Sequence, residues 1–81
     1  MAKSMPRLMK SALADLVRFG SLIRHKDSFV ADVSHYPELA HDPKAVEALV
    51  SERFGVRHGD GSICVTDKGR REWAAVEAEA A

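Results

Sequence analysis

The hydrophobic pattern near the start of the chain predicts an amphipathic helix over residues 6–19. Its apolar positions recur at helical spacing and are Leu8, Met9, Ala12, Leu13, Leu16 and Val17. Pro6 stands in the first turn and Gly20 follows the last one, so the start and stop signals come in the expected order. The opposite side of this helix is mostly positive, because it carries Arg7, Lys10 and Arg18.

A second apolar stripe predicts a helix over residues 43–54. Asp42 caps it, Pro43 begins it and Gly55 ends it. The residues that it buries are Val46, Leu49, Val50 and Phe54. The preceding apolar residues, within 21–36, fit either a short strand followed by a helix or two strands joined at a turn, and periodicity does not decide between the two.

Residues 56–66 predict a β-hairpin. β-Branched residues alternate on both sides of Gly59-Asp60-Gly61, and Asp and Gly tolerate the positive φ that tight turns need. Thr66 or Asp67 then caps a third helix, which runs past Trp73 into an alanine- and glutamate-rich tail.

A short internal repetition suggests a second arrangement. Arg-Phe-Gly occurs at 18–20 and again at 53–55, each time at a predicted helix end, and Arg-His-x-Asp occurs at 24–27 and 57–60. If the two halves are duplicated helix-plus-hairpin units, residues 21–33 form a second hairpin and the molecule has a pseudo-twofold axis. Coincidence at helix ends explains the same match.

Length and composition point to one small domain. The 81 residues are 46% hydrophobic and include a single cysteine, Cys64, which cannot form an internal disulfide. No stretch reaches the ~18 apolar residues of a membrane span, so we expect a cytoplasmic, non-membrane protein. The domain is expected to cover residues 1–81, with 1–5 and 78–81 frayed. A chain of this size rarely encloses a catalytic cavity alone, and a homodimer is expected.

The neutral net charge hides an alternation along the chain. Residues 1–26 hold six basic residues and one acidic residue, whereas residues 27–52 hold six acidic residues and one basic residue. Residues 53–71 hold five basic and two acidic residues, and the last ten residues hold three glutamates. Such an alternation either makes a basic face for an anionic partner or lets neighbouring segments attract each other.

The order of elements from residue 43 to residue 73 resembles the second half of winged-helix domains of bacterial regulators. A helix is followed by Gly55-Val56, an Asp-Gly hairpin, and Ile63-Cys64-Val65-Thr66-Asp67-Lys68-Gly69-Arg70-Arg71-Glu72-Trp73. The resemblance implies a small α+β, winged-helix-like domain with three or four helices and a C-terminal β-hairpin wing. It also implies a helix at residues 29–36 and a small strand at residues 21–24 that joins the sheet of the wing.

The resemblance further implies a DNA-binding function for the second half. Helix 43–54 enters the major groove and the wing contacts phosphate, so the residues expected at DNA are Lys44, Ser51, Arg57, His58 and Lys68. The sequence departs from the pattern at Glu47 and Glu52, which would be repelled by phosphate. We therefore carry two predictions: a non-catalytic transcriptional regulator that binds DNA as a homodimer, and a protein-interaction module on the same scaffold that uses the acidic middle segment and Trp73.

Other chemistry is not indicated. The four histidines, at positions 25, 35, 41 and 58, lack the helical spacing of a metal site, and we expect them to be solvated in loops. Cys64 lies mid-strand and is expected to fill space there. Because the chain has no nucleophile elbow, phosphate-binding glycine loop or carboxylate motif, we expect no enzyme, no catalytic residue, no metal and no cofactor.

Overall fold

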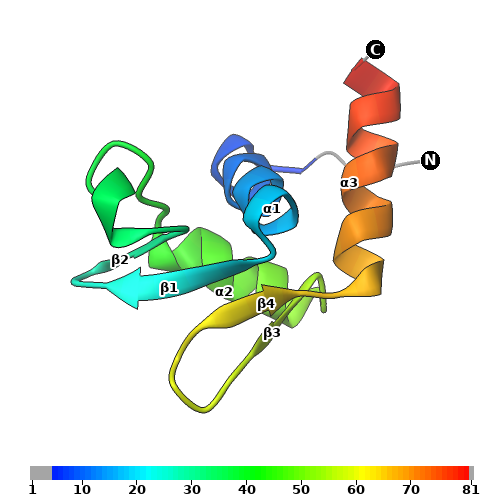
Figure 1. Cartoon of the computed structure of the whole chain (residues 1–81). Helices are drawn as coiled ribbons and strands as arrows, with labels where there is room; N and C mark the ends of the chain where they lie inside the picture. Colours follow the sequence, from blue (N-terminus) through cyan, green and yellow to red (C-terminus); the bar gives the residue numbers. More distant parts are fainter. Residues whose placement is uncertain (1–4, 81) are drawn as a thin grey trace.

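The computed structural model describes residues 5–80, in which three α-helices and a 3-10 helix accompany a four-stranded antiparallel sheet. The elements in chain order are α1 (Arg7–Phe19), β1 (Ser21–His25), β2 (Ser28–Val30), the 3-10 helix η1 (Val33–His35), α2 (Pro43–Ser51), β3 (Gly55–Arg57), β4 (Ile63–Val65) and α3 (Asp67–Ala80). The strand order β2-β1-β4-β3 puts β1 and β4 in the middle of the sheet. In Figure 1, α1 lies above the sheet, α2 lies behind it and α3 stands upright beside it.

The core fills the space between α1, α2 and the sheet. The helical stripe of α1 is buried at Met9, Ala12, Leu13 and Leu16, as the sequence predicts. These side chains meet the buried residues of the other elements, which are Leu22, Phe29, Val46, Leu49, Phe54 and Ile63. Among the described residues no polar or charged residue is classed as buried, so the core is held together by apolar packing.

Residues 21–36 form a hairpin followed by a single turn of 3-10 helix. Residues 29–36 are therefore not the helix that the winged-helix resemblance implies, whereas strand β1 at 21–25 lies where the resemblance expects one. The side chain of Asp32 accepts a hydrogen bond from the Ser34 backbone N–H, which starts a helical turn. Tyr36 is extended because it precedes Pro37, and the turn cannot continue.

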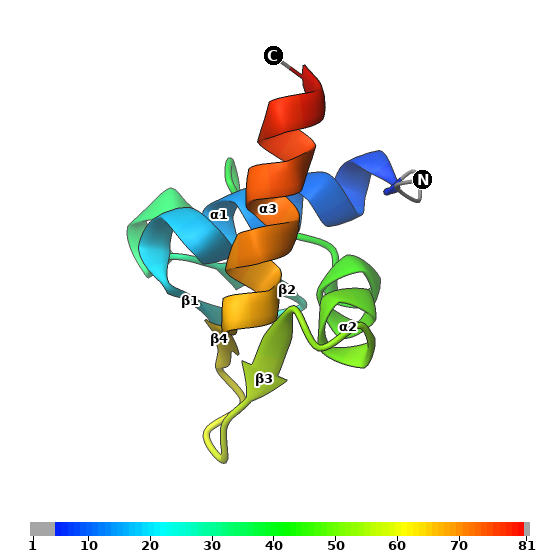
Figure 2. The ribbon, with the colours of Figure 1, turned by 90° about the vertical axis from the view of Figure 1, so that its right-hand side faces the viewer.

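The second hairpin and the third helix agree with the sequence prediction. β3 pairs with β4 in antiparallel register, Gly55 opposite Val65 and Arg57 opposite Ile63. Their connecting loop, residues 58–62, points away from the helices in Figure 2, and the hairpin β3–β4 with this loop is the segment that the sequence analysis predicts as a wing. Of the ends expected to fray, residues 78–80 continue α3, whereas residues 1–4 and 81 lie outside the described residues.

The pseudo-twofold that the repeated tripeptide suggests is not present in the sheet. Both halves do contain a helix followed by a hairpin, and residues 21–30 are the additional hairpin of that hypothesis. In a duplicated molecule β1 would correspond to β3, and β2 to β4. Because β1 pairs with β4, symmetry would require β3 to pair with β2, but these two strands are the opposite edges of the sheet. The two halves are thus alike locally and placed differently in the sheet.

Helix α3 is docked on the end of α2 through backbone contacts. The Thr66 hydroxyl donates to the carbonyl of Arg53 at 2.6 Å and accepts from the Gly69 N–H at 3.0 Å, so Thr66 is the N-cap that the sequence predicts. Gly69 lies against the Phe54 carbonyl, because a Cβ built on Gly69 would be 2.2 Å from that oxygen. The Thr-x-x-Gly part of the motif that carries the winged-helix resemblance therefore has a packing role.

Candidate functional site

The exposed side of α2 carries two of the predicted DNA-contact residues. Lys44 lies in the first turn, next to the cap in which the Asp42 carboxylate accepts from the Lys44 N–H at 2.9 Å. Ser51 is the last residue of the helix, and Glu47 lies between them on the same side. All three side chains are exposed, because Val46 and Leu49 turn the opposite side of α2 into the core.

An ion pair connects this side of α2 to the wing. The Arg57 guanidinium on β3 contacts the Glu47 carboxylate, and the two side chains are 47% and 54% exposed. A pair this exposed contributes at most about 1 kcal/mol to folding, so its main effect is positional. It brings the predicted residues Lys44, Ser51 and Arg57 around one acidic residue on a continuous surface.

The remaining predicted residues are less closely tied to that surface. His58 is exposed at the start of the wing loop, where its backbone N–H donates to the Ser62 carbonyl at 2.8 Å. In the same loop the Asp60 carboxylate accepts from the hydroxyl and the N–H of Ser62, and these bonds lower the pKa of Asp60. Lys68 belongs to α3, and its Nζ lies 5.5 Å from the centre of the Phe54 ring.

Acidic residues offset the basic ones across the α2 and wing region. The exposed bases from residue 42 to residue 65 are Lys44, Arg53 and Arg57. The exposed acids there are Asp42, Glu47, Glu52 and Asp60. The formal charge of the region is therefore −1 with histidine neutral, in contrast to the strongly positive surfaces typical of DNA-binding proteins.

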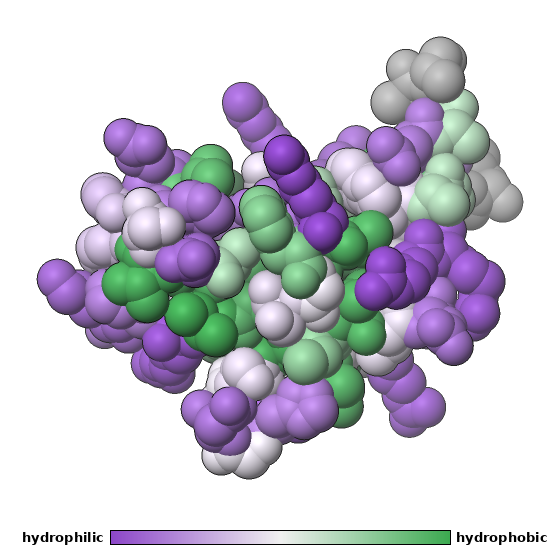
Figure 3. Space-filling model, in the orientation of Figure 1, coloured by the Kyte–Doolittle hydropathy of each residue, from purple (hydrophilic) through white to green (hydrophobic). Residues whose placement is uncertain are grey.

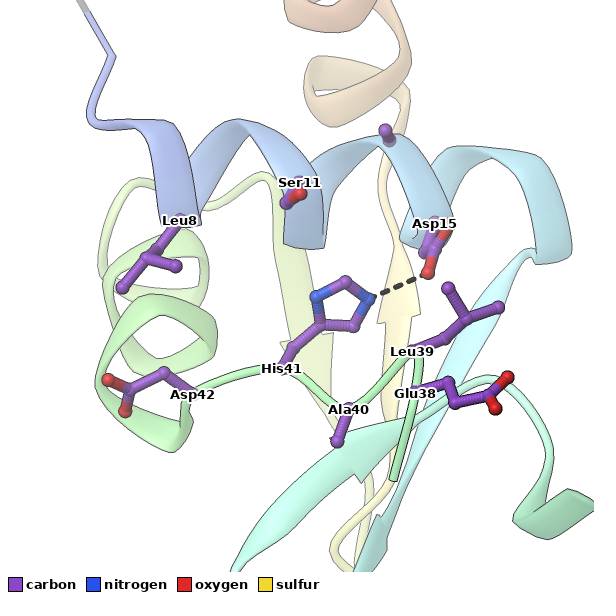
Figure 4. Close-up of a pocket in the computed structure, with 9 residues that line it drawn as sticks. Leu8, Ser11, Asp15, Glu38, Leu39, Ala40, His41 and Asp42 are labelled. Atoms are coloured by element: carbon purple, nitrogen blue, oxygen red, sulfur yellow. Dashed lines mark hydrogen bonds and ion pairs between the residues drawn. The ribbon is translucent and has the colours of Figure 1, made fainter. Parts of the chain in front are cut away.

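A histidine–aspartate pair, which the sequence analysis missed, lies beneath a cleft between α1 and the segment before α2. His41 Nε2 is 2.7 Å from a carboxylate oxygen of Asp15, and the two side chains are only 9% and 18% exposed. The cleft has a volume of about 250 Å³ and is lined by both residues together with Leu8, Ser11, Ala14, Glu38, Leu39, Ala40 and Asp42. Figure 4 shows the imidazole directed toward Asp15, with Leu8 and Leu39 at opposite sides of the cleft.

The histidine–aspartate pair holds a loop in place. The main chain of His41 exchanges two hydrogen bonds with Phe29 of β2, at 2.7 and 3.1 Å, while its ring reaches α1. His41 therefore ties α1 to the sheet edge and is not the solvated loop residue that the sequence predicts. Ser11 also lines the cleft on α1, and within the described residues it makes no hydrogen bond to His41.

Two other histidines, which the sequence predicts to be solvated in loops, and the cysteine are also placed by packing, whereas His58 is exposed. His25 packs edge-on against Tyr36 and His35 packs against Phe19, with ring centres 4.9 and 5.8 Å apart. Cys64 is half-buried on β4 between Ser21 and Val56 of the neighbouring strands. Over residues 5–80, no group of three or more His, Cys, Asp or Glu residues is arranged to hold a metal ion.

The surface is apolar in places. Figure 3 shows a band of apolar side chains across the middle of one face, bordered by hydrophilic ones. The large apolar side chains with the greatest exposure are Leu8, Phe19, Val33, Leu39 and Val56. Trp73 is not among them, because it is half-buried and packs against the core. No helix of the described chain combines the length and apolar character required to span a bilayer.

Comparison of the chain with protein-family models, with curated proteins and with solved structures finds no match.

Proposed function

We propose that this protein is a small, non-catalytic DNA-binding protein of the winged-helix type that acts as a transcriptional regulator. Helix α2 enters the major groove, and the hairpin β3–β4 is the wing. The order of elements supports this proposal, since α1 and β1 precede α2 and β1 pairs with the second strand of the hairpin, β4. A hairpin strand and a 3-10 turn replace the helix that normally precedes the recognition helix.

The observation that carries the proposal is the contact between Glu47 on α2 and Arg57 on β3. It makes the exposed side of the helix and the base of the wing one surface, as groove and backbone contacts by a single domain require. It also gives Arg57 two alternative anionic partners. In free protein Arg57 is paired with Glu47, and on DNA a phosphate takes the place of that carboxylate.

Competition between the Glu47 carboxylate and phosphate makes a distinctive prediction. Glu47→Gln removes a negative charge from the surface and releases Arg57, so duplex DNA should bind more tightly, about threefold or more at low salt, with a steeper salt dependence. Arg57→Glu should weaken binding at least tenfold for all sequences, because a phosphate contact carries no base information.

Fluorescence anisotropy with a labelled random-sequence duplex at about 20 mM salt, repeated at rising salt, measures both effects. Arg18→Glu on α1 is the matched control, since it makes the same charge change outside α2 and the wing and should leave the affinity within about twofold. Absence of binding to random duplex at low salt would overturn the proposal, as would an equal loss for Arg18→Glu and Arg57→Glu.

A protein-interaction module on the same scaffold is favoured by one observation. All six acidic residues of segment 27–52 are exposed, and they are Asp27, Asp32, Glu38, Asp42, Glu47 and Glu52. A basic partner protein would be attracted to this segment. In that case Glu47→Gln weakens partner binding, whereas it strengthens DNA binding. Trp73 does not serve as an exposed anchor for such a partner, because it packs against the core.

A further inference from the structure

The outward side of α3 is exposed along its length. The helix packs on α1 through its inner side, where Gly69 is buried and Trp73 and Val76 are half-buried. Figures 1 and 2 show the C-terminal half of α3 extending beyond the rest of the molecule. The exposed residues of the outer side and its flanks are Asp67, Lys68, Arg70, Arg71, Ala74, Ala75, Glu77, Ala78 and Glu79.

These residues form an alanine ridge between two charged lines. Ala74, Ala75 and Ala78 share the outer side, because each residue advances about 100° around a helix. Arg70 and Glu77 are separated by about two turns, so they lie on one flank of the ridge. Lys68 and Glu79 are separated by about three turns and lie on the other flank. Arg71 and Asp67 are also on the outer side, between the two lines, and the aliphatic part of an arginine side chain there can cover alanine methyl groups.

The charges on each flank are symmetric about one point of the helix. Arg70 and Glu77 are equally distant from the midpoint between Trp73 and Ala74, and so are Lys68 and Glu79. Each pair has one base and one acid. A twofold axis level with that midpoint, perpendicular to the helix, brings every one of these bases opposite an acid of a second copy.

We infer that α3 is the contact surface of a homodimer in which two copies of the helix pack antiparallel. Arg70 faces the partner's Glu77 and Lys68 faces the partner's Glu79, which gives four ion pairs around the axis. The alanines between the two lines let the helix backbones approach closely. An antiparallel arrangement keeps each flank facing the same flank of the second copy, so unlike charges meet on both sides.

Within one chain Asp67 is three residues before Arg70 and Glu72 is four residues after Lys68, but these neighbours form no ion pair in the described residues. Residues seven or eleven apart on a helix are on the same side but too far apart to contact each other. The two ion pairs of the described residues join His41 to Asp15 and Arg57 to Glu47, and neither involves α3. Lys68 is held over the Phe54 ring in the free chain and has to turn to reach a second copy, whereas Arg70 does not. The inference does not depend on DNA binding.

Charge reversal tests the pairing. Sedimentation velocity of the full chain at about 1 to 500 µM should show a monomer–dimer equilibrium. Arg70→Glu and Glu77→Arg should each weaken it about tenfold or more, since each reversal replaces two attractive pairs by two repulsive ones. The double variant Arg70→Glu with Glu77→Arg should restore it. An equimolar mixture of the two single variants should form heterodimers, because positions 70 and 77 are then both acidic in one chain and both basic in the other.

Arg24→Glu on β1 is the matched control and should leave the dimer unchanged. Circular dichroism of each variant confirms that the fold is kept. A chain that is monomeric at 500 µM overturns the inference, and so does a double variant as weak as the single ones.

Cross-linking tests the antiparallel direction in a Cys64→Ser background. Ala74→Cys lies beside the proposed axis and should form a disulfide between copies under mild oxidation. Ala78→Cys is expected to be about 13 Å from its copy, because nine residues at about 1.5 Å separate position 78 from its symmetric position 69. Equal cross-linking of the two variants contradicts the antiparallel arrangement and indicates a parallel one.

Discussion

The tripeptide Arg-Phe-Gly ends α1 at residues 18–20 and follows α2 at residues 53–55. In the two copies a different residue of the tripeptide adopts the left-handed conformation that ends the helix. After α1 the left-handed residue is Gly20, with φ 88°, and Phe19 is 44% exposed. After α2 the left-handed residue is Arg53, with φ 65°, and Phe54 is 7% exposed. A shift of two residues in the position of the left-handed residue within the tripeptide therefore moves the phenylalanine from the surface into the core.

The glycines differ in the same way. Gly20 supplies backbone freedom, because a Cβ there would meet nothing within 4 Å, and its positive φ is what favours glycine. Gly55 supplies space, because a Cβ there would lie 2.8 Å from Ile63 Cγ2 and 3.1 Å from Leu16 Cδ2. The prediction that Gly55 ends α2 is wrong, because Gly55 belongs to strand β3 and the helix ends before it. The helix ends at Ser51 in a Schellman motif, in which the N–H of Phe54 reaches the Leu49 carbonyl.

The largest expected difference in stability is between substitution of Phe54 and substitution of Phe19. Phe54→Ala should lower the free energy of unfolding by about 3 to 4 kcal/mol, since it empties a buried site, whereas Phe19→Ala should cost less than about 1 kcal/mol. For a domain of this size the first change removes much of the total stability. Urea titration followed by circular dichroism measures both. Equal losses for the two variants would show that burial does not distinguish the two copies.

The glycine that needs space gives the next largest effect. Gly55→Ala should cost about 2 kcal/mol, because the added methyl group pushes on Ile63 and Leu16 within a packed core. Gly59→Ala in the wing is the matched control: it has open space around it and should change stability by less than about 0.5 kcal/mol. Thermal unfolding of both variants tests this, and a control as unstable as Gly55→Ala would rule out the steric explanation.

Substitution of Gly20 and of Arg53, the left-handed residues of the two tripeptides, should change the free energy of unfolding in opposite directions. Gly20→Ala places a Cβ at positive φ and should cost about 1 kcal/mol. Arg53→Gly removes a side chain from the same conformation and should stabilise by about 0.5 kcal/mol, after the extra chain entropy of glycine is subtracted. The melting temperatures should move by several degrees downward and a few degrees upward. A lower melting temperature for Arg53→Gly would mean that its side chain contributes more than the strain costs.

The smallest expected effect is on the pH dependence of stability, and a similar turn in each half contributes to it. Asp32 and Asp60 each accept hydrogen bonds from the serine two residues later. The pKa of Asp32 is lowered chiefly by the Ser34 N–H, and that of Asp60 chiefly by the Ser62 hydroxyl. A lowered folded-state pKa adds stability that is complete above the unfolded pKa of about 3.8 and is lost as the pH falls through the folded value.

Stability should therefore fall slightly below about pH 4. Replacing both Asp32 and Asp60 by Asn keeps an acceptor oxygen and removes the titration, so the double variant should lose less stability between pH 5 and pH 2 than the parent does. Urea midpoints across that range provide the test. Each single variant should account for a similar share of the difference, and an unchanged pH profile in the double variant speaks against the two turns as its source.

The elements that the sequence predicts are those with local signals. Asp42, Thr66 and the Asp-Gly turn act on residues two to three positions away, and the structure confirms the helix starts and the hairpin that they predict. The sequence places the end of α2 at Gly55 because glycine is the usual left-handed residue, yet arginine occupies that conformation at position 53. Local chemistry therefore locates the helix and misplaces its last turn.

The features that the sequence does not predict depend on distant residues. Asp15 and His41 are 26 positions apart, and no spacing rule relates them. Glu47 and Arg57 could be named separately as exposed charges, but their contact depends on how the hairpin folds against α2. Residues 31–42 offer no periodicity, and a single capped turn followed by a proline is all that their chemistry supports.

The close approach of Gly69 to the Phe54 carbonyl has a consequence for how this protein can change over time. Peptide groups and one hydroxyl at the start of α3, together with Trp73 on its inner side, determine the direction in which α3 leaves the body. Substitutions on the outer side of α3 therefore leave its direction unaltered. A substitution there changes what the helix binds, including a second copy of the chain, without rebuilding the domain that holds it.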